Sequence, residues 1–254
     1  MPRFLISIAL LFIAGQETGY RSGGTFIGAI ICEDGIIVAS DSRTTFMDGS
    51  GRAFGYVDGM PKIYVQGGPA VAMSGLTSME GELFSSFVRR NGYLLERPVN
   101  EILLGFLVWL PLANSNGVAM ISAGFADGTP TICAKSPILP QSCTSSGYFT
   151  SKNSPTLRET FTKLGRIPKT NEAAAALKAA IEEYSRTDPT VGGPVSILKL
   201  TKGAPAQWLA NPATDNGWTR VCDVVGEHRR GRVRIVPLGT QQELDLHLNA
   251  ACPK

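Results

Sequence analysis

The sequence predicts an α+β protein in which helices pack on layered sheets, and three observations support this class. The chain has 254 residues, 43% hydrophobic and 18% charged, which suits one globular domain with a full-sized core. The first predicted strands are apolar on both faces, so they belong inside a layered structure. Predicted elements come in blocks of strands, two helices, strands, two helices and a strand, which favours α+β over a βαβ alternation.

The first residues predict an export signal. One arginine precedes an apolar run over residues 4–14, which has about the length of a signal-peptide core and is too short to span a bilayer. The small residues after it only approximate a cleavage site, so a buried leader strand remains an alternative. We assign residues 1–24 to a signal peptide, a propeptide or both. We therefore expect an exported protein, periplasmic or secreted, in preference to a cytoplasmic one, and we expect no stable membrane span.

Two β-rich runs at residues 25–32 and 36–40 predict the central hairpin of the sheet. The Glu33-Asp34-Gly35 segment joins them, and Asp-Gly is a strong hairpin turn signal. Because both runs are apolar on both faces, we expect this hairpin to be buried between other layers.

The remaining elements follow in chain order. Strands are expected at 62–65 and 70–73, and apolar residues at helical spacing predict a helix over about 76–87. After these we expect a helix at 100–113, strands at 118–124 and 131–134, helices at 154–164 and 171–185, and a strand at 195–200. The proline- and glycine-containing residues 204–254 are interpreted as a C-terminal extension of a domain that spans 25–203.

The cysteine pattern fits an exported chain. The odd count of five leaves at least one thiol unpaired within the chain. Cys32 lies inside an apolar run, so we interpret it as a buried and inert thiol. In an oxidising compartment the other cysteines could pair as Cys133 with Cys143 and Cys222 with Cys252, although sequence alone does not establish connectivity.

Several kinds of site are excluded by composition and spacing. The formal net charge of +3 is too small to indicate a nucleic-acid partner. The two histidines, His228 and His247, lie in the extension, far from any nucleophile and without partners at zinc-ligand spacing. No glycine-rich phosphate loop follows a strand. We therefore expect no metal, no cofactor and no nucleic acid.

The dipeptide before Thr25 suggests a nucleophile that carries its own base. If the chain is cut between Gly24 and Thr25, the new α-amine has a reference pKa of about 7.7 to 8.0 and can accept the hydroxyl proton near neutral pH. A glycine at position 24 leaves the preceding carbonyl unobstructed. On the dipeptide alone, a threonine that merely begins a strand after a Gly-Gly turn is the simpler interpretation.

Four stretches in order resemble the proteasome β-subunit family of N-terminal nucleophile hydrolases. They are GGTFIGAIICEDGIIVASDSR from Gly23, DGMPKIYVQGGPAVAMSG from Asp58, SSGY from Ser145 and DPTVGGPVSIL from Asp188. The ordered set covers most of residues 23–200 and is more specific than any one stretch. The resemblance implies a four-layer αββα sandwich, self-processing before Thr25 and hydrolysis of amide bonds.

The resemblance also implies a catalytic group around Thr25. Thr25 is similar to the nucleophile, its α-amine to the general base, and Lys62 to the lysine that lowers the proton affinity of both. Asp41 resembles the carboxylate that holds this lysine. An ideal two-residue turn at Asp34-Gly35 would place Asp41 opposite Gly28, on the face away from Thr25, whereas a three-residue loop or a bulge would restore a shared face. Without the family context, Asp41 and Lys62 would be interpreted as a structural ion pair.

Further roles follow from the same resemblance. Gly75 is similar to the glycine whose N–H stabilises the oxyanion, and would otherwise be a turn at a helix entry. Ser146 and Asp188 resemble the serine and aspartate that orient and support the amine. The family has a second serine where this chain has Val191, which cannot donate or accept a hydrogen bond through its side chain. The network around the amine must therefore be incomplete or rewired.

Three functions remain open on this basis. The first is a threonine peptidase, active after exposure of Thr25 and acting on peptides. The second is an amidase or acylase of the same chemical class that acts on a small amide, and the third is a catalytically silent protein of this fold used for binding or assembly. Formation of a homo-oligomer is left open, and the sequence does not specify the substrate.

Overall fold

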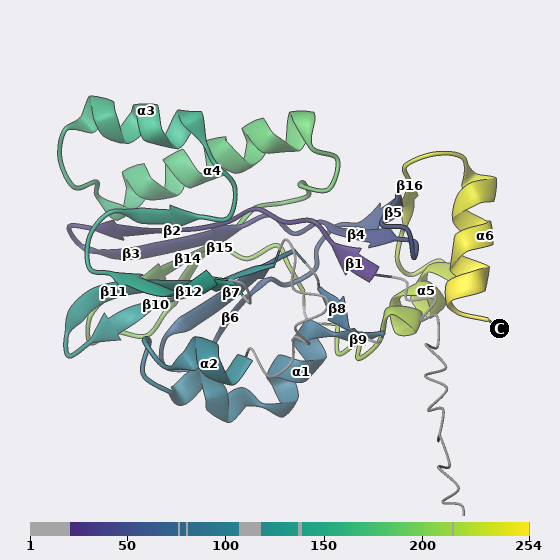
Figure 1. The fold of residues 1–254 in the computed structure, drawn as a ribbon, viewed down its shortest axis with the longest axis horizontal. Coiled ribbons are helices and arrows are strands. Elements are labelled where there is room, and N and C mark those ends of the chain that lie inside the picture. The colour runs from purple at the N-terminus through teal and green to yellow at the C-terminus, as the bar shows by residue number, and fades with distance from the viewer. Residues whose placement is uncertain are drawn as a thin grey trace, which may run out of the picture.

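The computed structural model describes residues 21–75, 77–79, 81–106, 118–136, 139–214 and 216–253. Within these ranges two five-stranded antiparallel sheets lie face to face, and helices cover the outer face of each (Figure 1). The first sheet contains, in spatial order, β13 (Tyr148–Thr150), β2 (Ile27–Cys32), β3 (Gly35–Ser40), β14 (Ser196–Leu200) and β15 (Gln207–Ala210). The second contains β12 (Leu139–Thr144), β11 (Thr129–Ser136), β10 (Ala119–Ala126), β7 (Ala70–Ser74) and β6 (Ile63–Val65).

The helices complete four layers. The first sheet is covered by α3 (Pro155–Leu164) and α4 (Thr170–Thr187). The second is covered by α1 (Phe84–Arg90), the 3₁₀ helix η1 (Gly92–Glu96) and α2 (Ile102–Phe106). The predicted αββα sandwich is confirmed by this layer order (Figure 1).

The hairpin of β2 and β3 is buried on both faces, as its sequence predicts. Alternate residues such as Ile27 and Val38 face the second sheet, where they pack with Ile121. The intervening residues, such as Ile30, face α4 and pack with Leu177. Each isoleucine or leucine buried in this way contributes about 1.5 to 3 kcal/mol, so the hairpin anchors both cores.

The turn of this hairpin lies one residue earlier than predicted. Cys32 pairs with Gly35, so the turn residues are Glu33 and Asp34 rather than Asp34-Gly35. The Asp34 carboxylate accepts hydrogen bonds from the backbone N and the Oγ1 of Thr170, at 2.9 and 2.8 Å, where α4 begins. This contact between the turn and a distant helix fixes the position of Asp34. The sequence around the turn gives no sign of the contact, because Thr170 is far away along the chain.

The helix predicted from about residue 76 begins later. Two short strands, β8 (Ser78–Met79) and β9 (Glu82–Leu83), form a hairpin first, and α1 begins at Phe84. The C-terminal part of the chain pairs with this hairpin, which favours strand over helix. Of the helix predicted at 100–113, α2 accounts for residues 102–106, and residues 107–117 lie outside the described residues.

The segment after Gly203 packs against the rest of the molecule. β15 continues the first sheet, and β16 (Val236–Pro237) joins β1 (Arg21–Gly23), β4 (Thr44–Met47) and β5 (Ala53–Val57) in a four-stranded sheet. Helices α5 (Val221–Arg229) and α6 (Gln241–Ala251) cover this sheet through an apolar cluster. The domain boundary at residue 203 stays a prediction, because packing alone does not define an independent unit.

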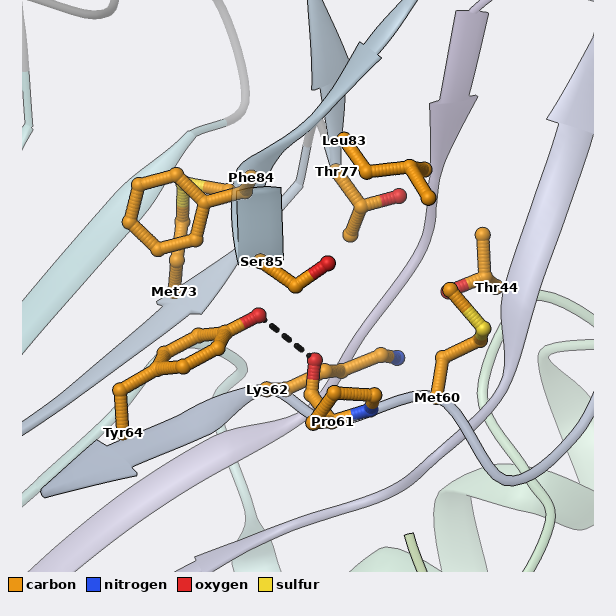
Figure 2. A pocket seen from close by; sticks show the side chains of 10 residues that line it. All are labelled: Thr44, Met60, Pro61, Lys62, Tyr64, Met73, Thr77, Leu83, Phe84 and Ser85. Carbon is orange, nitrogen blue, oxygen red and sulfur yellow. Dashed lines mark hydrogen bonds between the residues drawn. The ribbon is translucent and has the colours of Figure 1, made fainter. Parts of the chain in front are cut away.

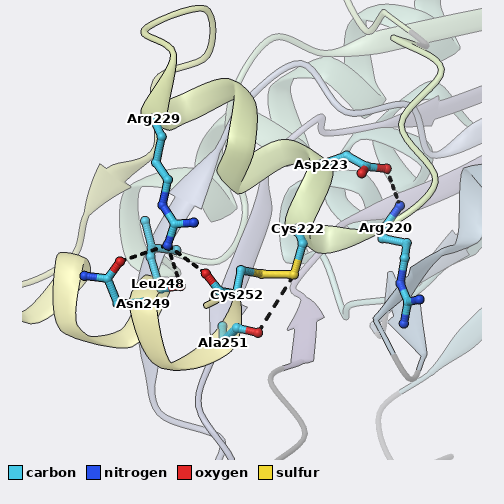
Figure 3. The surroundings of a disulfide bond; sticks show 8 residues. All are labelled: Arg220, Cys222, Asp223, Arg229, Leu248, Asn249, Ala251 and Cys252. Carbon is cyan, nitrogen blue, oxygen red and sulfur yellow. Dashed lines mark hydrogen bonds between the residues drawn. A yellow bond between two sulfur atoms is a disulfide. The ribbon is translucent and has the colours of Figure 1, made fainter. Parts of the chain in front are cut away.

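The cysteines pair as the sequence allowed. Disulfides join Cys133 to Cys143 and Cys222 to Cys252, and the second links α5 to the end of α6 (Figure 3). Cys32 is a free buried thiol, and burial raises its pKa to about 12, so it stays neutral. The two disulfides are consistent with an oxidising environment outside the cytoplasm. In the part of the chain that the structure describes, no helix has the length and apolar character needed to cross a bilayer.

Gly35→Ala should destabilise the protein strongly. Gly35 has a φ of 149°, and a Cβ atom there would lie 2.4 Å from the Leu200 carbonyl oxygen. We expect a loss of about 3 kcal/mol or more in the free energy of unfolding, measured in urea. Gly203→Ala is the control, because Gly203 also has a positive φ but no heavy atom lies within 4 Å of an added methyl group, so about 1 kcal/mol is expected. Equal losses would show that the contact with Leu200 is unimportant.

Candidate active site

Thr25, Asp41 and Lys62 lie together at the ends of three strands. Thr25 is 3% exposed, Asp41 0% and Lys62 2%. The Lys62 Nζ donates to Asp41 Oδ1 at 3.1 Å and to the Gly24 carbonyl oxygen at 3.2 Å, and it also donates to the Arg43 carbonyl. The Thr25 Oγ1 donates to the same Gly24 carbonyl. The lysine and the hydroxyl therefore meet at the carbonyl that precedes Thr25.

The Asp41 carboxylate is held by backbone amides as well as by Lys62. Its Oδ1 accepts from Phe26 N at 2.9 Å, and its Oδ2 accepts from Gly192 N at 2.9 Å and from Arg43 N at 3.3 Å. Asp41 follows the last residue of β3, so its direction is set by these bonds and not by strand alternation. This is how the carboxylate reaches Lys62 without the three-residue loop or bulge considered from the sequence.

Burial governs the protonation of this pair. Burial raises the pKa of the Asp41 carboxyl above its usual value, although Lys62 and the amides of Gly192 and Phe26 act in the opposite direction. Burial also lowers the pKa of the Lys62 ammonium, against the attraction of Asp41. A lysine with a lowered pKa can donate a hydrogen bond to an oxyanion and can also release a proton more readily than an exposed lysine.

A second polar cluster, around Asp188, lies against Gly24. Asp188 follows α4, and its Oδ2 accepts from Lys152 Nζ at 2.5 Å. Its Oδ1 accepts from the Thr190 backbone N at 2.9 Å and from Thr190 Oγ1 at 2.6 Å. A Cβ atom built on Gly24 would lie 2.5 Å from the Cβ of Thr190, so Thr190 packs directly against Gly24. Asp188 is among the residues predicted from the sequence, whereas no sequence pattern pointed to Lys152 or Thr190.

The structure does not bring Ser146 to Thr25. β13 runs antiparallel to β2 with Tyr148 opposite Ile30, which places the exposed Ser146 beside the far end of β2. A strand advances about 3.4 Å per residue, so nearly the whole of β2 separates the two residues. Ser151 lies at the near end instead, where its Oγ accepts from Ile27 N at 3.0 Å. The SSGY motif does not reveal how β13 is aligned with β2, so the distance between Ser146 and Thr25 could not be predicted from it.

Gly75 and Val191 have different positions relative to the site. Gly75 follows β7 with a φ of 94°, and the backbone N of Met73, two residues earlier, donates to the Lys62 carbonyl at 3.3 Å. Gly75 is therefore at the same end of its sheet as Lys62, and its role as an oxyanion donor stays a prediction.

Val191 is fully buried in the apolar cluster that contains Phe26, which makes it a core residue.

A pocket opens beside Lys62 (Figure 2). It holds about 280 Å³ of empty space, open solvent included. Its lining is mainly apolar, with hydroxyl groups from Thr44, Thr77 and Ser85. The apolar side chains are those of Met60, Pro61, Tyr64, Met73, Leu83 and Phe84. Because Lys62 belongs both to the pocket and to the group around Gly24, a side chain bound here would lie next to Lys62 and close to the Gly24 carbonyl.

The C-terminal segment holds one wall of this pocket. The backbone N of Leu83 donates to the Thr219 carbonyl at 2.9 Å, and Val221 N donates to the Gly81 carbonyl at 2.9 Å. These bonds fix the β8–β9 hairpin just before α5 begins. A third bond, from Thr214 N to the Gly59 carbonyl at 3.0 Å, fixes the segment next to Met60. The shape of the pocket therefore depends on the segment after residue 203.

Residues 21–23, just before Gly24 and Thr25, form the short extended strand β1, and residues 1–20 lie outside the described residues. β1 is the edge strand of the four-stranded sheet and pairs antiparallel with β4, with Gly23 opposite Thr45 and Arg21 opposite Met47. Its other side contacts β8. The chain entering the site is thus held by a backbone ladder with β4 and lies close to β8. Among the described residues, no group of His, Cys, Asp and Glu has the arrangement of a metal site.

No protein-family model matches the chain, and no curated protein matches it in sequence. Among solved structures, the fold is similar to that of the Anbu (Gly-1) mutant from Hyphomicrobium sp. strain MC1. The two chains share 13% identity with a TM-score of 0.49, over 89% of this chain and 94% of the other. At this identity the likeness concerns the fold and not the chemistry.

Lys62→Met should leave the Asp41 carboxylate buried without its cation. We expect a loss of about 3 to 5 kcal/mol in the free energy of unfolding, and a comparable loss for Asp41→Asn. The double variant removes both charges, so its loss should be smaller than the sum. Urea unfolding of preparations with the same N-terminus measures this.

Lys199→Met is the control for this pair. Lys199 forms a more exposed ion pair with Asp34 at 3.0 Å, and we expect a loss of about 1 kcal/mol or less. Strictly additive losses for Asp41 and Lys62 would show that the two buried charges do not stabilise one another.

Proposed function

We propose that this protein is an N-terminal threonine hydrolase that cuts its own chain between Gly24 and Thr25 and then hydrolyses peptide bonds. The observation that carries the proposal is the Gly24 carbonyl oxygen, which accepts from Thr25 Oγ1 and from Lys62 Nζ, the latter at 3.2 Å. A cationic donor polarises the carbonyl towards attack and stabilises the negative charge that attack places on its oxygen. The attacking hydroxyl is on the adjacent residue.

The processing step follows from this arrangement. Thr25 Oγ bonds to the Gly24 carbonyl carbon, and Lys62 stabilises the oxyanion. The bond between that carbon and the Thr25 nitrogen then breaks, and the nitrogen takes up the proton that the hydroxyl lost. Water hydrolyses the resulting ester, which releases residues 1–24 with a new carboxyl group and leaves Thr25 with a free amine and a free hydroxyl.

The mature reaction uses the same atoms. The Thr25 α-amine, with a reference pKa of about 7.7 to 8.0, takes the hydroxyl proton while Oγ attacks the substrate carbonyl. The proton passes to the leaving amine of the substrate, and water then hydrolyses the acyl ester. Lys62, held by Asp41, favours the ionised forms of both Oγ and the oxyanion.

The leader strand favours a peptide substrate over a small amide. Loss of residues 1–24 would leave the edge of β4 open, and an extended peptide can pair with such an edge by main-chain hydrogen bonds. The pocket beside Lys62 is lined mainly by apolar side chains, which suits an apolar side chain of the substrate. We infer cleavage next to such a residue by an exported enzyme, and the two disulfides support export.

Thr25→Ala should keep residues 1–24 attached and abolish hydrolysis. Without the hydroxyl no ester can form, so the Gly24–Thr25 bond has no internal nucleophile. Intact-mass analysis and a fluorogenic peptide amide measure the two effects. Thr131→Ala, at a buried threonine on β11 in the second sheet, should still mature and hydrolyse. Full activity in protein that retains Gly24 would contradict this mechanism. Protein that is cut before Thr25 but hydrolyses no peptide would favour the small-amide alternative.

Ser85→Phe should narrow the choice of substrate. The Ser85 side chain points into the pocket, so a phenyl ring there would occupy the space for a bulky side chain (Figure 2). We expect kcat/KM for substrates with leucine or phenylalanine before the cut bond to fall by roughly tenfold or more, with little change for alanine. Ser85→Ala should keep the original preference. Parallel losses for large and small substrates would place the specificity elsewhere.

A further inference from the structure

We propose that the Thr190 hydroxyl binds and orients the α-amine of mature Thr25, and that Asp188 and Lys152 position Thr190. This inference rests on the proposed function, because the amine exists only after residues 1–24 are removed. Thr190 is not among the site residues predicted from the sequence.

Thr190 lies against the residue whose departure creates the amine. The heavy atoms nearest to a Cβ built on Gly24 all belong to Thr190: its Cβ and carbonyl oxygen at 2.5 Å and its Oγ1 at 2.9 Å. When Gly24 leaves, the space next to the Thr25 nitrogen is therefore bordered by the side chain and the carbonyl oxygen of Thr190. A hydroxyl there is close to a new group with several N–H donors.

The Thr190 hydroxyl oxygen is free to accept a hydrogen bond from the α-amine. Its proton is donated to Asp188 Oδ1 at 2.6 Å, so the lone pairs of Oγ1 remain for another donor. The backbone N of Thr190 donates to the same carboxylate oxygen at 2.9 Å, which fixes the residue at two points. A hydroxyl with a committed proton orients an amine, and leaves the nitrogen lone pair free to face Thr25 Oγ.

Asp188 is itself held in one orientation. Its other oxygen accepts from Lys152 Nζ at 2.5 Å, and Arg43 Nη1 donates to the Pro189 carbonyl at 3.2 Å. Burial disfavours ionisation, but hydrogen bonds from Lys152 and Thr190 outweigh it and lower the pKa of the Asp188 carboxyl. The carboxylate thus stays charged at neutral pH and keeps the proton of Thr190 directed towards itself.

The other hydroxyl and apolar side chains considered for this role are used elsewhere. Val191 belongs to the apolar core, and Ser146 lies at the far end of β2. Ser151 Oγ accepts from Ile27 N, which ties it to the start of the strand. Thr190, by contrast, packs on Gly24 and carries an available acceptor.

The amine would sit between two charged groups. Lys62 and Asp41 lie on one side, and Asp188, Lys152 and the more distant Arg43 lie on the other. A hydroxyl acceptor bonds more strongly to an ammonium than to an amine, so it raises the pKa of the amine. Loss of the hydroxyl should therefore lower the pKa of the amine and shift the pH dependence of kcat/KM, which loss of a purely structural contact would not do.

Thr190→Val and Thr190→Ser test the proposal on protein whose mass shows that it begins at Thr25. Valine keeps the branched shape but removes the acceptor, so we expect kcat to fall by roughly three- to tenfold with KM unchanged. The acid limb of the pH profile of kcat/KM should move to lower pH. Serine keeps the hydroxyl and should retain both the rate and the limb. An unchanged limb and rate in Thr190→Val would overturn the inference.

Lys152→Met provides an independent test if Thr190→Val does not mature. Lys152 is partly exposed, so the fold should tolerate the change. Removal of a cation near the amine should move the acid limb to higher pH and lower kcat with KM unchanged. Lys163→Met, at an exposed helical ion pair, is the control and should change neither. A limb in Lys152→Met that matches the wild type would also overturn the inference.

Different results would contradict the proposed hydrolase function and the role of Thr190. Thr25→Ala protein that hydrolyses peptides as fast as the wild type would remove the proposed function and the amine with it. A matured enzyme that depends on Thr25 but is indifferent to Thr190 and Lys152 would reject only the role of this cluster.

Discussion

The buried ion pair of Lys62 and Asp41 is the interaction on which the rest of the site depends. Removing both charges from water costs several kcal/mol per ion, so the pair persists only where other groups complete its hydrogen bonds. Phe26 N and Gly192 N donate those bonds to Asp41, and the Gly24 carbonyl oxygen accepts a hydrogen bond from Lys62 Nζ. The pair thereby joins the ends of β2, β3 and β6 with the loop after α4.

The layered architecture explains why these groups can be held so rigidly. The β2–β3 hairpin is packed on both faces, by the second sheet and by α4, and Thr25 and Asp41 lie directly at its open end. A site on the ends of buried strands is more precisely positioned than one on loops. Figure 1 shows the hairpin between the α3–α4 layer and the second sheet.

The segment after residue 203 contributes to the site although it lies outside the stretches that resemble the family. It hydrogen-bonds to the β8–β9 hairpin and so supports the wall of the pocket that contains Leu83. Beyond it, Cys222–Cys252 and the Arg229 guanidinium, which donates to the Leu248 and Cys252 carbonyls, hold α6 against α5 (Figure 3). The helices α5 and α6 are thereby joined to the segment that supports the pocket wall.

The sequence by itself determined the apolar strands, the central hairpin, the available cysteine pairs and the selection of Thr25, Asp41 and Lys62, because these depend on local patterns or on motif order. Only the tertiary structure decided the turn at Glu33-Asp34, the β8–β9 hairpin, and the placement of Lys152 and Thr190, but not Ser146, near Gly24. Those outcomes depend on strand register and on contacts between distant residues, such as Ile27 N with Ser151 Oγ. A shift of one residue in register reverses the face of a side chain, and no local pattern records it.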